Sequence, residues 1–317
     1  MKIDIFTHVI PKKYTRALAK FLPESEHGFN EEPSALSDPD MRIELMDESG
    51  ISVNVLTLGQ PPVEMLGDAV KAAYLARIAN DALAEYALKN PDRLIPTATL
   101  PMNNIDAALE ELNRAINELN FKGIQIYTSV NCKPLDSPEF LPVYEEMSRY
   151  DLPIWIHPLK DTAESDYPDE NRSMYNLAPL IGWPHATAMA MMRISAAGIL
   201  ERYQNLKFIT HHSGGTVPYL FKRIECAPFK FENLSRPITD SLRLFYYDTA
   251  VQGSTPNLMC AYTFCGVDKM LFATDFPMTS TGIIRQTIES IEDMDISSEE
   301  KEKIFIKNAA RLLKLAT

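Results

Sequence analysis

Histidine and aspartate side chains that could bind a metal or move a proton follow several short apolar runs of the sequence. They are His8 after IDIFT, His157 after LPIWI, His211 and His212 after LKFIT, and Asp275 after KMLFAT. Imidazole nitrogens and a carboxylate oxygen suit zinc and neighbouring divalent transition metals. The same groups could act without a metal as general acids and bases. Any one of them alone fits a hydrogen-bonded core residue, so their common position at the ends of apolar runs is what indicates a site.

The apolar runs predict the elements that would position these groups. The runs are KIDIFTH, VNVLTL, LIPTATL, GIQIY, LPIWIHP, LKFITHH, LRLFYYDTA and KMLFATDFP. Each is followed by an amphipathic, helix-like stretch, so we expect an α/β fold, a (β/α)₈ TIM barrel with a parallel sheet. Such barrels carry their active sites at the carboxyl ends of the strands. An open doubly wound sheet is the alternative, but no glycine-rich phosphate loop follows the first run.

Composition limits the classes of protein to which the chain can belong. The 317 residues are 45% hydrophobic and 23% charged, and no low-complexity linker divides them, so we expect residues 1–317 to form a single domain. The net charge of −12 argues against nucleic acid or an anionic membrane as a partner. Met1 leads directly into a polar, alternating run, so we expect no signal peptide and no membrane span. On this ground we expect a cytoplasmic protein, and four widely spaced cysteines indicate reduced, mostly buried thiols.

Two polar, proline-containing segments are too long for ordinary loops between a strand and a helix. They extend from Pro11 to about Pro39 and from Lys160 to about Pro184. We interpret both as excursions that cover the carboxyl end of the barrel.

Several motifs in a fixed order resemble the amidohydrolase-related (amidohydrolase 2) family of decarboxylases. They are IDxxTHxxP, DPDMRIELMDESGI, LPIWIHP, LKFITHHSGG with the following PYLFKRIE, and LFATDFP. The family includes aminocarboxymuconate-semialdehyde, resorcylate and carboxyvanillate decarboxylases. The likeness extends from Lys2 to NAARLLKL near the C-terminus, and it is specific as a set rather than motif by motif.

The resemblance implies a barrel with one divalent metal, usually zinc and in some relatives manganese. The family's ligands correspond by motif to Phe6, His8, His157 and Asp275. Phe6 cannot be a ligand, so this chain keeps His8, His157 and Asp275. Three protein ligands still suffice for a catalytic metal with open positions.

The resemblance also assigns roles to residues around the metal. His212 has the position of the family's catalytic histidine, which activates a water or protonates the substrate carbon, and we expect His212 and Asp275 to be catalytic. Arg42 corresponds to an arginine that can hold a substrate carboxylate, and Arg223 to one that reaches the site of the neighbouring subunit in a homodimer. His185, after the second excursion, is a further candidate for substrate binding. His211 is next to His212, so in a continuing strand it would face the opposite way and pack or support the site.

Alternative interpretations remain for several of these positions. Arg42 could instead form a surface ion pair, Arg223 could be an ordinary solvated helix residue, and Asp248 could cap a loop. His27, in a polar segment, is expected to be exposed.

The function that the resemblance implies is decarboxylation of an aromatic or unsaturated carboxylic acid, with the metal as Lewis acid and His212 handling the proton. The same site could instead hydrolyse an ester, lactone or amide, or hydrate a double bond. Because Phe6 removes one ligand, a metal-free enzyme or a small-molecule binding protein is a third possibility. The family's substrate-stacking tryptophan is missing near Asn176 to Pro179, with Trp183 close but shifted, so the substrate itself stays open.

Overall fold

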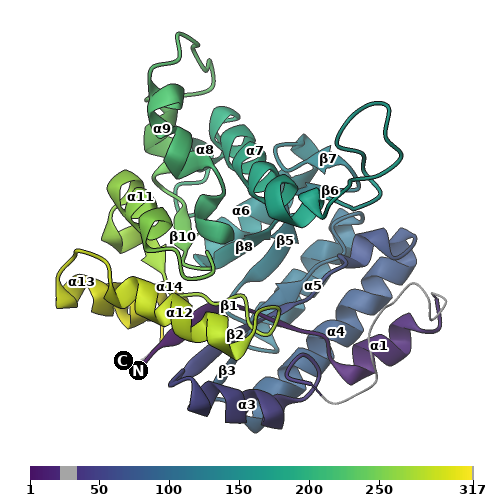
Figure 1. The fold of residues 1–317 in the computed structure, drawn as a ribbon. Coiled ribbons are helices and arrows are strands. Elements are labelled where there is room, and N and C mark those ends of the chain that lie inside the picture. The colour runs from purple at the N-terminus through teal and green to yellow at the C-terminus, as the bar shows by residue number, and fades with distance from the viewer. Residues whose placement is uncertain (22–33, 316–317) are drawn as a thin grey trace.

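A computed structural model describes residues 1–21 and 34–315 of the chain (Figure 1). His27 and the central part of the first excursion lie outside the described residues. The barrel strands occupy the eight runs expected from the sequence: β1 (Ile3–Val9), β2 (Val53–Leu58), β3 (Leu94–Pro96) with its continuation β4 (Ala98–Thr99), β5 (Ile124–Tyr127), β8 (Pro153–His157), β9 (Lys207–Thr210), β10 (Tyr246–Asp248) and β11 (Met270–Leu271).

The strands pair in parallel and close on themselves. Their order is β1-β2-β3 in one sheet and β11-β10-β9-β8-β5-β4 in the other. The backbone N–H of Thr97, between β3 and β4, donates to the Leu56 carbonyl on β2 at 3.0 Å. On the other side, the N–H of Ile5 on β1 donates to the carbonyl of Phe272, just after β11, at 2.9 Å. The result is a closed (β/α)₈ barrel, and the fold predicted from the sequence is confirmed.

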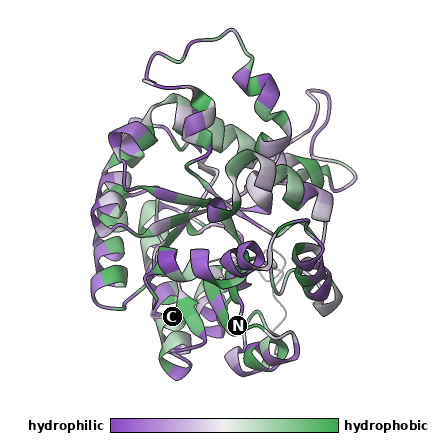
Figure 2. Ribbon diagram, turned by 90° about the vertical axis from the view of Figure 1, so that its left-hand side faces the viewer, coloured by the Kyte–Doolittle hydropathy of each residue, from purple (hydrophilic) through white to green (hydrophobic). Residues whose placement is uncertain are grey.

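Helices follow the strands and cover the outside of the barrel. The main ones are α1 (Lys12–Leu18), α3 (Pro39–Glu48), α4 (Ala69–Lys89), α5 (Ile105–Asn117), α6 (Leu141–Tyr150), α7 (Trp183–Ala196), α9 (Val217–Glu225), α11 (Thr255–Cys265) and α12 (Thr281–Glu292). Figure 2 shows green and purple alternating along these helices, as expected when one stripe of each helix packs on the barrel.

Short elements complete the described part of the chain. The helical ones are η1 (Val63–Met65), η2 (Pro138–Phe140), η3 (Ala178–Gly182), α8 (Ile199–Arg202), η4 (His212–Gly214), α10 (Ile238–Leu242), η5 (Val267–Lys269), α13 (Ser298–Glu302), η6 (Lys303–Lys307) and α14 (Asn308–Leu313). A small antiparallel pair, β6 (Ser129–Val130) with β7 (Lys133–Pro134), follows β5.

Helix α4 illustrates how the sequence sets these elements. Its N-cap, Asp68, accepts hydrogen bonds from the backbone N–H groups of Val70 and Lys71, and these are donors that the first turn cannot satisfy by itself. Alanine and leucine residues at helical spacing, from Ala72 to Leu83, form its buried face.

Strand β1 has an irregular register that affects the inside of the barrel. Its pairing with β2 shifts between Asp4 and Thr7. The indole N–H of Trp155, on β8, donates to the Ile5 carbonyl at 2.7 Å. Because β1 and β8 are not neighbours in the sheet order, this bond crosses the barrel interior. Irregularities of this kind often lie beside active sites, where they redirect side chains.

The second excursion folds back towards the carboxyl end of the barrel. Lys160 pairs with Asp166, and the Asp166 carboxylate also accepts from the Ser173 hydroxyl at 2.8 Å. The indole N–H of Trp183 donates to the Lys160 carbonyl at 3.2 Å, which joins the two ends of the excursion. The structure thereby places Trp183 at the start of α7, over the strand ends.

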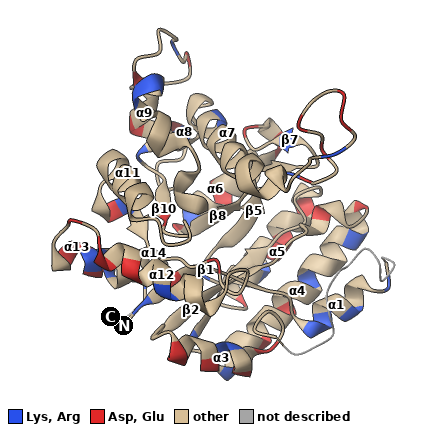
Figure 3. Cartoon of the chain, viewed as in Figure 1, with Lys and Arg blue, Asp and Glu red and all other residues tan. Residues whose placement is uncertain are grey.

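Charged side chains lie mainly on the outer helices and loops. Figure 3 shows both signs mixed along these helices, whereas the central strands are almost entirely uncharged. In the part of the chain that the structure describes, no helix combines the length and apolarity needed to cross a membrane.

Candidate active site

The site begins with His8 near the end of β1 and Asp275 after β11. The Nε2 atom of His8 lies 3.1 Å from Oδ1 of Asp275, and both side chains are largely buried. On the other side of the His8 ring, Nδ1 lies 2.9 Å from the Thr57 hydroxyl, which itself donates to the Thr7 carbonyl at 2.9 Å. A hydroxyl has one hydrogen, so Nδ1 of His8 must be the donor to Thr57. The unprotonated Nε2 then faces Asp275.

His157, at the end of β8, is oriented in the same way. Its Nδ1 atom lies 2.7 Å from the Pro158 carbonyl, which can only accept, so Nδ1 carries the proton. The ring meets His8 edge-on with centroids 5.0 Å apart, and the Tyr127 ring packs beside it at 5.1 Å.

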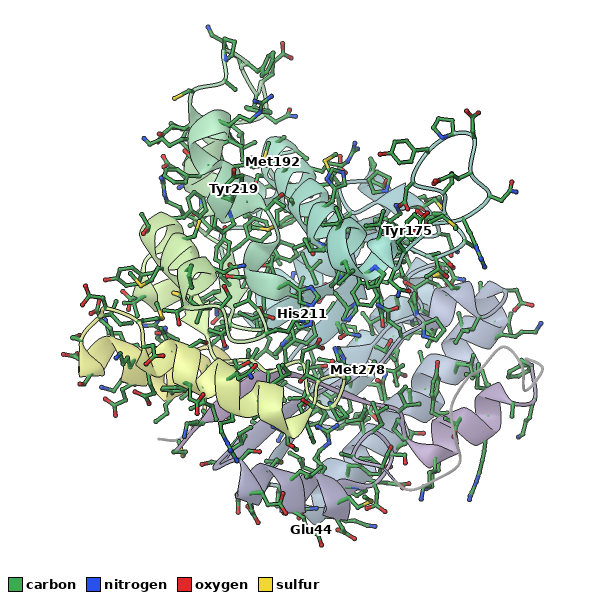
Figure 4. The ribbon with its side chains drawn as sticks, in the orientation of Figure 1. Glu44, Tyr175, Met192, His211, Tyr219 and Met278 are labelled. Carbon is green, nitrogen blue, oxygen red and sulfur yellow. The ribbon has the colours of Figure 1, made fainter. Side chains whose placement is uncertain are left out.

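His211 joins the same cluster, and Figure 4 shows it near the middle of the molecule. Its Nδ1–H donates to Oδ2 of Asp248, the last residue of β10. Oδ1 of Asp248 accepts from the backbone N–H groups of Ser213 at 2.9 Å and Ala250 at 3.1 Å. Nε2 of His211 lies 3.3 Å from Oδ1 of Asp275. One ring nitrogen each of His8, His157 and His211 lies within 4.8 Å of the others.

The expectation that His211 faces away from His212 is wrong, because strand alternation does not continue through this segment. Strand β9 ends at Thr210, and His212 and Ser213 have φ values of +52° and +56°. The two imidazole rings stack with centroids 4.0 Å apart and an interplanar angle of 30°. His211 is fully buried, whereas His212 keeps some exposure and lies 3.9 Å, through Nε2, from Oδ2 of Asp275.

Two glycines make this turn possible. Gly214 and Gly215 have φ values of +72° and +61°. A Cβ atom on Gly214 would lie 2.4 Å from the Tyr247 ring, and one on Gly215 would lie 2.1 Å from the Pro184 carbonyl oxygen. The HHSGG motif is therefore explained by conformation and by close packing.

Asp4 and Arg42 support the site from behind. Asp4 accepts from the backbone N–H and the hydroxyl of Thr274, so it holds the segment that presents Asp275. Arg42 is buried, and its guanidinium donates to the His8 carbonyl, to the Thr7 hydroxyl at 3.2 Å and to the Asn54 side chain at 3.1 Å. The surface ion pair considered for Arg42 is therefore wrong. Its charge contacts protein oxygens behind β1, a position that differs from the expected contact with a substrate carboxylate.

The pKa values of these groups follow from burial and from their mutual contacts. Burial lowers the pKa of His8 and of His212, and it lowers that of His157 further, because the charges of His8 and His211 add to the effect. Burial opposes the charged form of His211 as well, but Asp248 and Asp275 raise its pKa to about 10. Although burial alone would raise the pKa of Asp275, the histidines hold it well below its ordinary value. In the isolated chain, an anionic Asp275 thus faces the neutral imidazoles of His8 and His212. It also faces His211, whose ring is positively charged because both of its nitrogens carry a proton.

Phe6 occupies the position that the family resemblance gives to a ligand. Its ring is fully buried, with its centroid 4.0 Å from that of His211, 5.5 Å from that of His8 and 6.0 Å from that of His157. The phenyl ring therefore lines one side of the histidine cluster and adds no donor atom to it.

The remaining candidates lie away from this cluster or at its mouth. His185 is exposed on the first turn of α7, and Arg223 is exposed on α9. No described contact links either residue to the cluster, so their roles remain predictions. Trp183, in contrast, has its ring centroid 5.9 Å from that of His157 and 6.4 Å from that of His212, nearly parallel to the latter.

Sequence reasoning missed some of the partners that orient the histidines. Asp248 has the capping bonds proposed for it, but it also fixes the tautomer of His211. Thr57, at the end of β2, orients His8, and a threonine at a strand end gives no distinctive signal. For Asp248, the acid that ends the run LFYYD was the available signal.

Comparisons with known proteins agree with the barrel fold and with the order of the motifs. The family model described as amidohydrolase matches residues 3–315. A gamma-resorcylate decarboxylase from Rhizobium sp. (strain MTP-10005) is 31% identical over 87% of this chain and 87% of its own length. The 2-amino-3-carboxymuconate-6-semialdehyde decarboxylase of Dictyostelium discoideum is 29% identical over 99% of this chain and 92% of its own length.

A solved structure shows the same likeness to decarboxylases. A dihydroxybenzoic acid decarboxylase from Polaromonas sp. JS666, determined with bound manganese and the inhibitor 2-nitroresorcinol, superposes with a TM-score of 0.83 at 30% identity and covers 99% of this chain and 96% of its own. The barrel, the ordered motifs and the matched length identify this chain as a member of the amidohydrolase family.

Proposed function

We propose that this protein is a metal-dependent decarboxylase of an aromatic carboxylic acid. The observation that carries the proposal is the convergence of His8, His157, His211 and Asp275 at the carboxyl ends of the barrel strands. The curated relatives support the reaction type, because they are named as decarboxylases of resorcylate and of a carboxymuconate semialdehyde.

The donor atoms fit a divalent cation. His8 Nε2 and His211 Nε2 are buried and have no hydrogen-bond partner among residues 1–21 and 34–315. Both face Asp275 Oδ1, which is itself an acceptor, at 3.1 and 3.3 Å. Two acceptors held this close in a buried site need a proton or a cation between them; His211 holds such a proton in the isolated chain, and a bound metal would displace it. Imidazole nitrogens and a carboxylate oxygen favour zinc, which we propose as the metal; manganese, present in the Polaromonas structure, is the alternative.

When bound, the metal would act as a Lewis acid that holds an oxygen beside the scissile carboxylate and stabilises negative charge as CO₂ leaves. The carbon–carbon bond then breaks, its electron pair stays on the ring carbon, and that carbon takes up a proton. In this proposal His212 supplies or relays the proton, a role supported by its position beside the cluster with partial access to its mouth. The Trp183 indole would cover an aromatic ring beside His212 and exclude water.

The substrate class can be tested directly. The first probe is 2,6-dihydroxybenzoate, followed by other hydroxylated benzoates and unsaturated acids, with ester and lactone hydrolysis measured in parallel. We expect CO₂ and the decarboxylated product from at least one aromatic acid. Hydrolysis without CO₂ release from any acid would contradict the decarboxylase proposal and favour a hydrolase.

A homodimer and a cytoplasmic location are part of the proposal. Large apolar side chains are exposed on α9 and around the second excursion, among them Tyr219, Tyr175 and Ile181. Such exposure is common at subunit interfaces. Arg223 lies on α9 as well, so a partner packed there could receive it. The expectation that the cysteines are mostly buried is wrong, because two are exposed and two are half-buried, but all four are free, which supports a reducing compartment.

Dimers that combine two different inactive variants test whether Arg223 acts in the site of the partner subunit. Arg223→Ala and His212→Asn proteins, each expected to have low activity, are unfolded together and refolded. If Arg223 completes the partner's site, mixed dimers regain up to about a quarter of the normal activity, because half the dimers are mixed and each has one intact site. No recovery, or an active monomer in sedimentation, would exclude that role.

A further inference from the structure

We propose that His211 is itself a ligand of the metal, through Nε2, and that it replaces the donor lost at Phe6. The predicted set of His8, His157 and Asp275 becomes a set of four protein ligands. This inference rests on the proposed metal-dependent function.

The first support is the fixed tautomer of His211. Asp248 is anchored by two backbone N–H groups on one oxygen, and its other oxygen receives the Nδ1–H of His211. Metal-binding histidines characteristically donate their second ring nitrogen to a carboxylate or a carbonyl, which orients the ring and raises its basicity. His8 and His157 have the same arrangement, with Thr57 and the Pro158 carbonyl as acceptors.

The second support is the position of Nε2, the ring nitrogen of His211 that does not contact Asp248. Nε2 of His211 is fully buried, lacks a hydrogen-bond partner among the described residues and points at the same Asp275 oxygen as Nε2 of His8. Tetrahedral ligand atoms about 2.0–2.2 Å from zinc are roughly 3.3–3.6 Å apart. The separations of 3.3 Å from His211 and 3.1 Å from His8 to Asp275 Oδ1 are close to that value.

The third support is the place of Phe6. Its ring contacts His211 more closely than it contacts His8 or His157, with centroids 4.0 Å apart. A phenyl ring cannot coordinate a metal, but it fills the space beside His211 and limits rotation of the imidazole. Strand β1 therefore supplies one donor, His8, and the β9 end supplies the additional one.

His212 is the natural comparison, because it has the same side chain one residue later. Donor atoms of His211, His212 and Asp275 also lie within 4.8 Å of one another, but Nε2 of His212 lies farther from Asp275, at 3.9 Å, and its ring is the more exposed of the two. Trp183 stacks over it from the mouth of the site. We therefore assign His211 to the metal and leave His212 for the proton.

The test measures metal binding rather than turnover. Metal-free wild type, His211→Ala and the matched control His212→Ala are titrated with Zn²⁺ against a chromophoric chelator. The visible absorption of each Co²⁺-loaded protein is also recorded, because the intensity and position of these bands depend on coordination number and ligand type. We expect one metal per wild-type chain, at least about 100-fold weaker binding and an altered Co²⁺ spectrum for His211→Ala, and little change in either for His212→Ala.

Asp248→Asn gives a second, more conservative test, because it keeps side-chain size but removes the negative charge beside His211. We expect metal affinity to fall about 10–100-fold. Circular dichroism identifies any variant that fails to fold, and the remaining variant then decides the question. If wild type binds one metal and the folded His211→Ala and Asp248→Asn proteins bind it equally well with unchanged Co²⁺ spectra, His211 is not a ligand. The proposed function would survive that result, whereas a wild type that binds no metal would contradict both.

Discussion

Arg42 carries a positive charge beneath the strand that presents His8. Burial lowers the pKa of this guanidinium to about 9, with Asp4 opposing the shift, so the side chain remains protonated at neutral pH. It donates to the backbone of the very residue that we propose as a metal ligand. At the scale of single residues, much of the site is therefore built from groups that orient the metal-binding side chains and do not contact the metal themselves.

Replacing Arg42 tests whether this contact is structural. Arg42→Met keeps the aliphatic stem but leaves the His8 carbonyl, Thr7 and Asn54 without their buried donor, so we expect the free energy of unfolding to fall by about 3–5 kcal/mol. Urea denaturation measures the change. Arg149→Met, which removes exposed ion pairs with Glu145 and Glu146, should cost less than about 1 kcal/mol. Unchanged stability with a raised KM would instead show that Arg42 mainly binds substrate.

The residues that could be predicted were those that follow an apolar run. His8, His157 and Asp275 follow apolar runs, and the structure brings His8 and Asp275 into contact and His157 beside His8. His211 could not be oriented from the sequence, because the alternation rule assumes a strand that continues, and β9 stops one residue earlier. The contact of Thr57 with His8 could not be predicted for a different reason, since it depends on which strand lies beside β1.

At the scale of elements, the turn from β9 into η4 determines which histidine faces the site. The left-handed residues from His212 to Gly215 allow neighbouring imidazoles to lie on the same side of the chain. Gly214 packs against the ring of Tyr247 on the next strand, so the turn and β10 are interlocked.

A pair of glycine variants separates conformation from packing. Gly214 and Gly266 have nearly equal φ values, +72° and +74°, but a Cβ on Gly266 would meet nothing within 4 Å. A ψ of 162° places Gly266 in a backbone region almost restricted to glycine, so we expect Gly266→Ala to cost about 1–3 kcal/mol of unfolding free energy, and Gly214→Ala to cost at least about 2 kcal/mol more because of its clash with Tyr247. Denaturant unfolding of both proteins measures the difference. Equal costs would mean that Tyr247 moves aside and that the close packing is unimportant.

Glu64, in η1 after β2, gives the protein a predictable pH dependence. Burial raises the pKa of its carboxyl to about 7. The folded chain then holds a proton that the unfolded chain releases near pH 4.5, so this stabilising contribution is complete at low pH and is lost as the pH rises through about 7. We expect the stability of Glu64→Gln, relative to wild type, to increase by up to about 3 kcal/mol between pH 4.5 and 8. A difference that does not change with pH would contradict the raised pKa.

The eight strands were predictable because each combines apolar residues with a clear boundary, and the (β/α)₈ barrel follows from their number. The path of the second excursion was not, because it depends on polar contacts such as those of Asp166 and on the bond from Trp183 to the Lys160 carbonyl. For this reason the sequence suggested only that Trp183 was close to the expected tryptophan position, whereas the structure puts its ring beside His157 and His212.

At the scale of the whole molecule, the barrel brings together residues that are far apart in the chain. His8 and Asp275 are near opposite ends of the sequence but adjacent at the seam where β1 meets the segment after β11. The two ends of the described chain also lie close together, at the other end of this seam (Figure 1). The family membership is confirmed, and the decarboxylase function agrees with the named relatives. The single-domain organisation and the dimer stay predictions.

The most direct test of the account is CO₂ release from 2,6-dihydroxybenzoate, or from the best acid of the screen, before and after the metal is removed. The protein is treated with a chelator, dialysed, assayed, and assayed again after stoichiometric Zn²⁺ or Mn²⁺ is returned. The account predicts that activity disappears with the metal and returns with one equivalent of it, because the proposed mechanism assigns the Lewis acid to the metal. Full activity in protein shown by elemental analysis to contain no transition metal would contradict it.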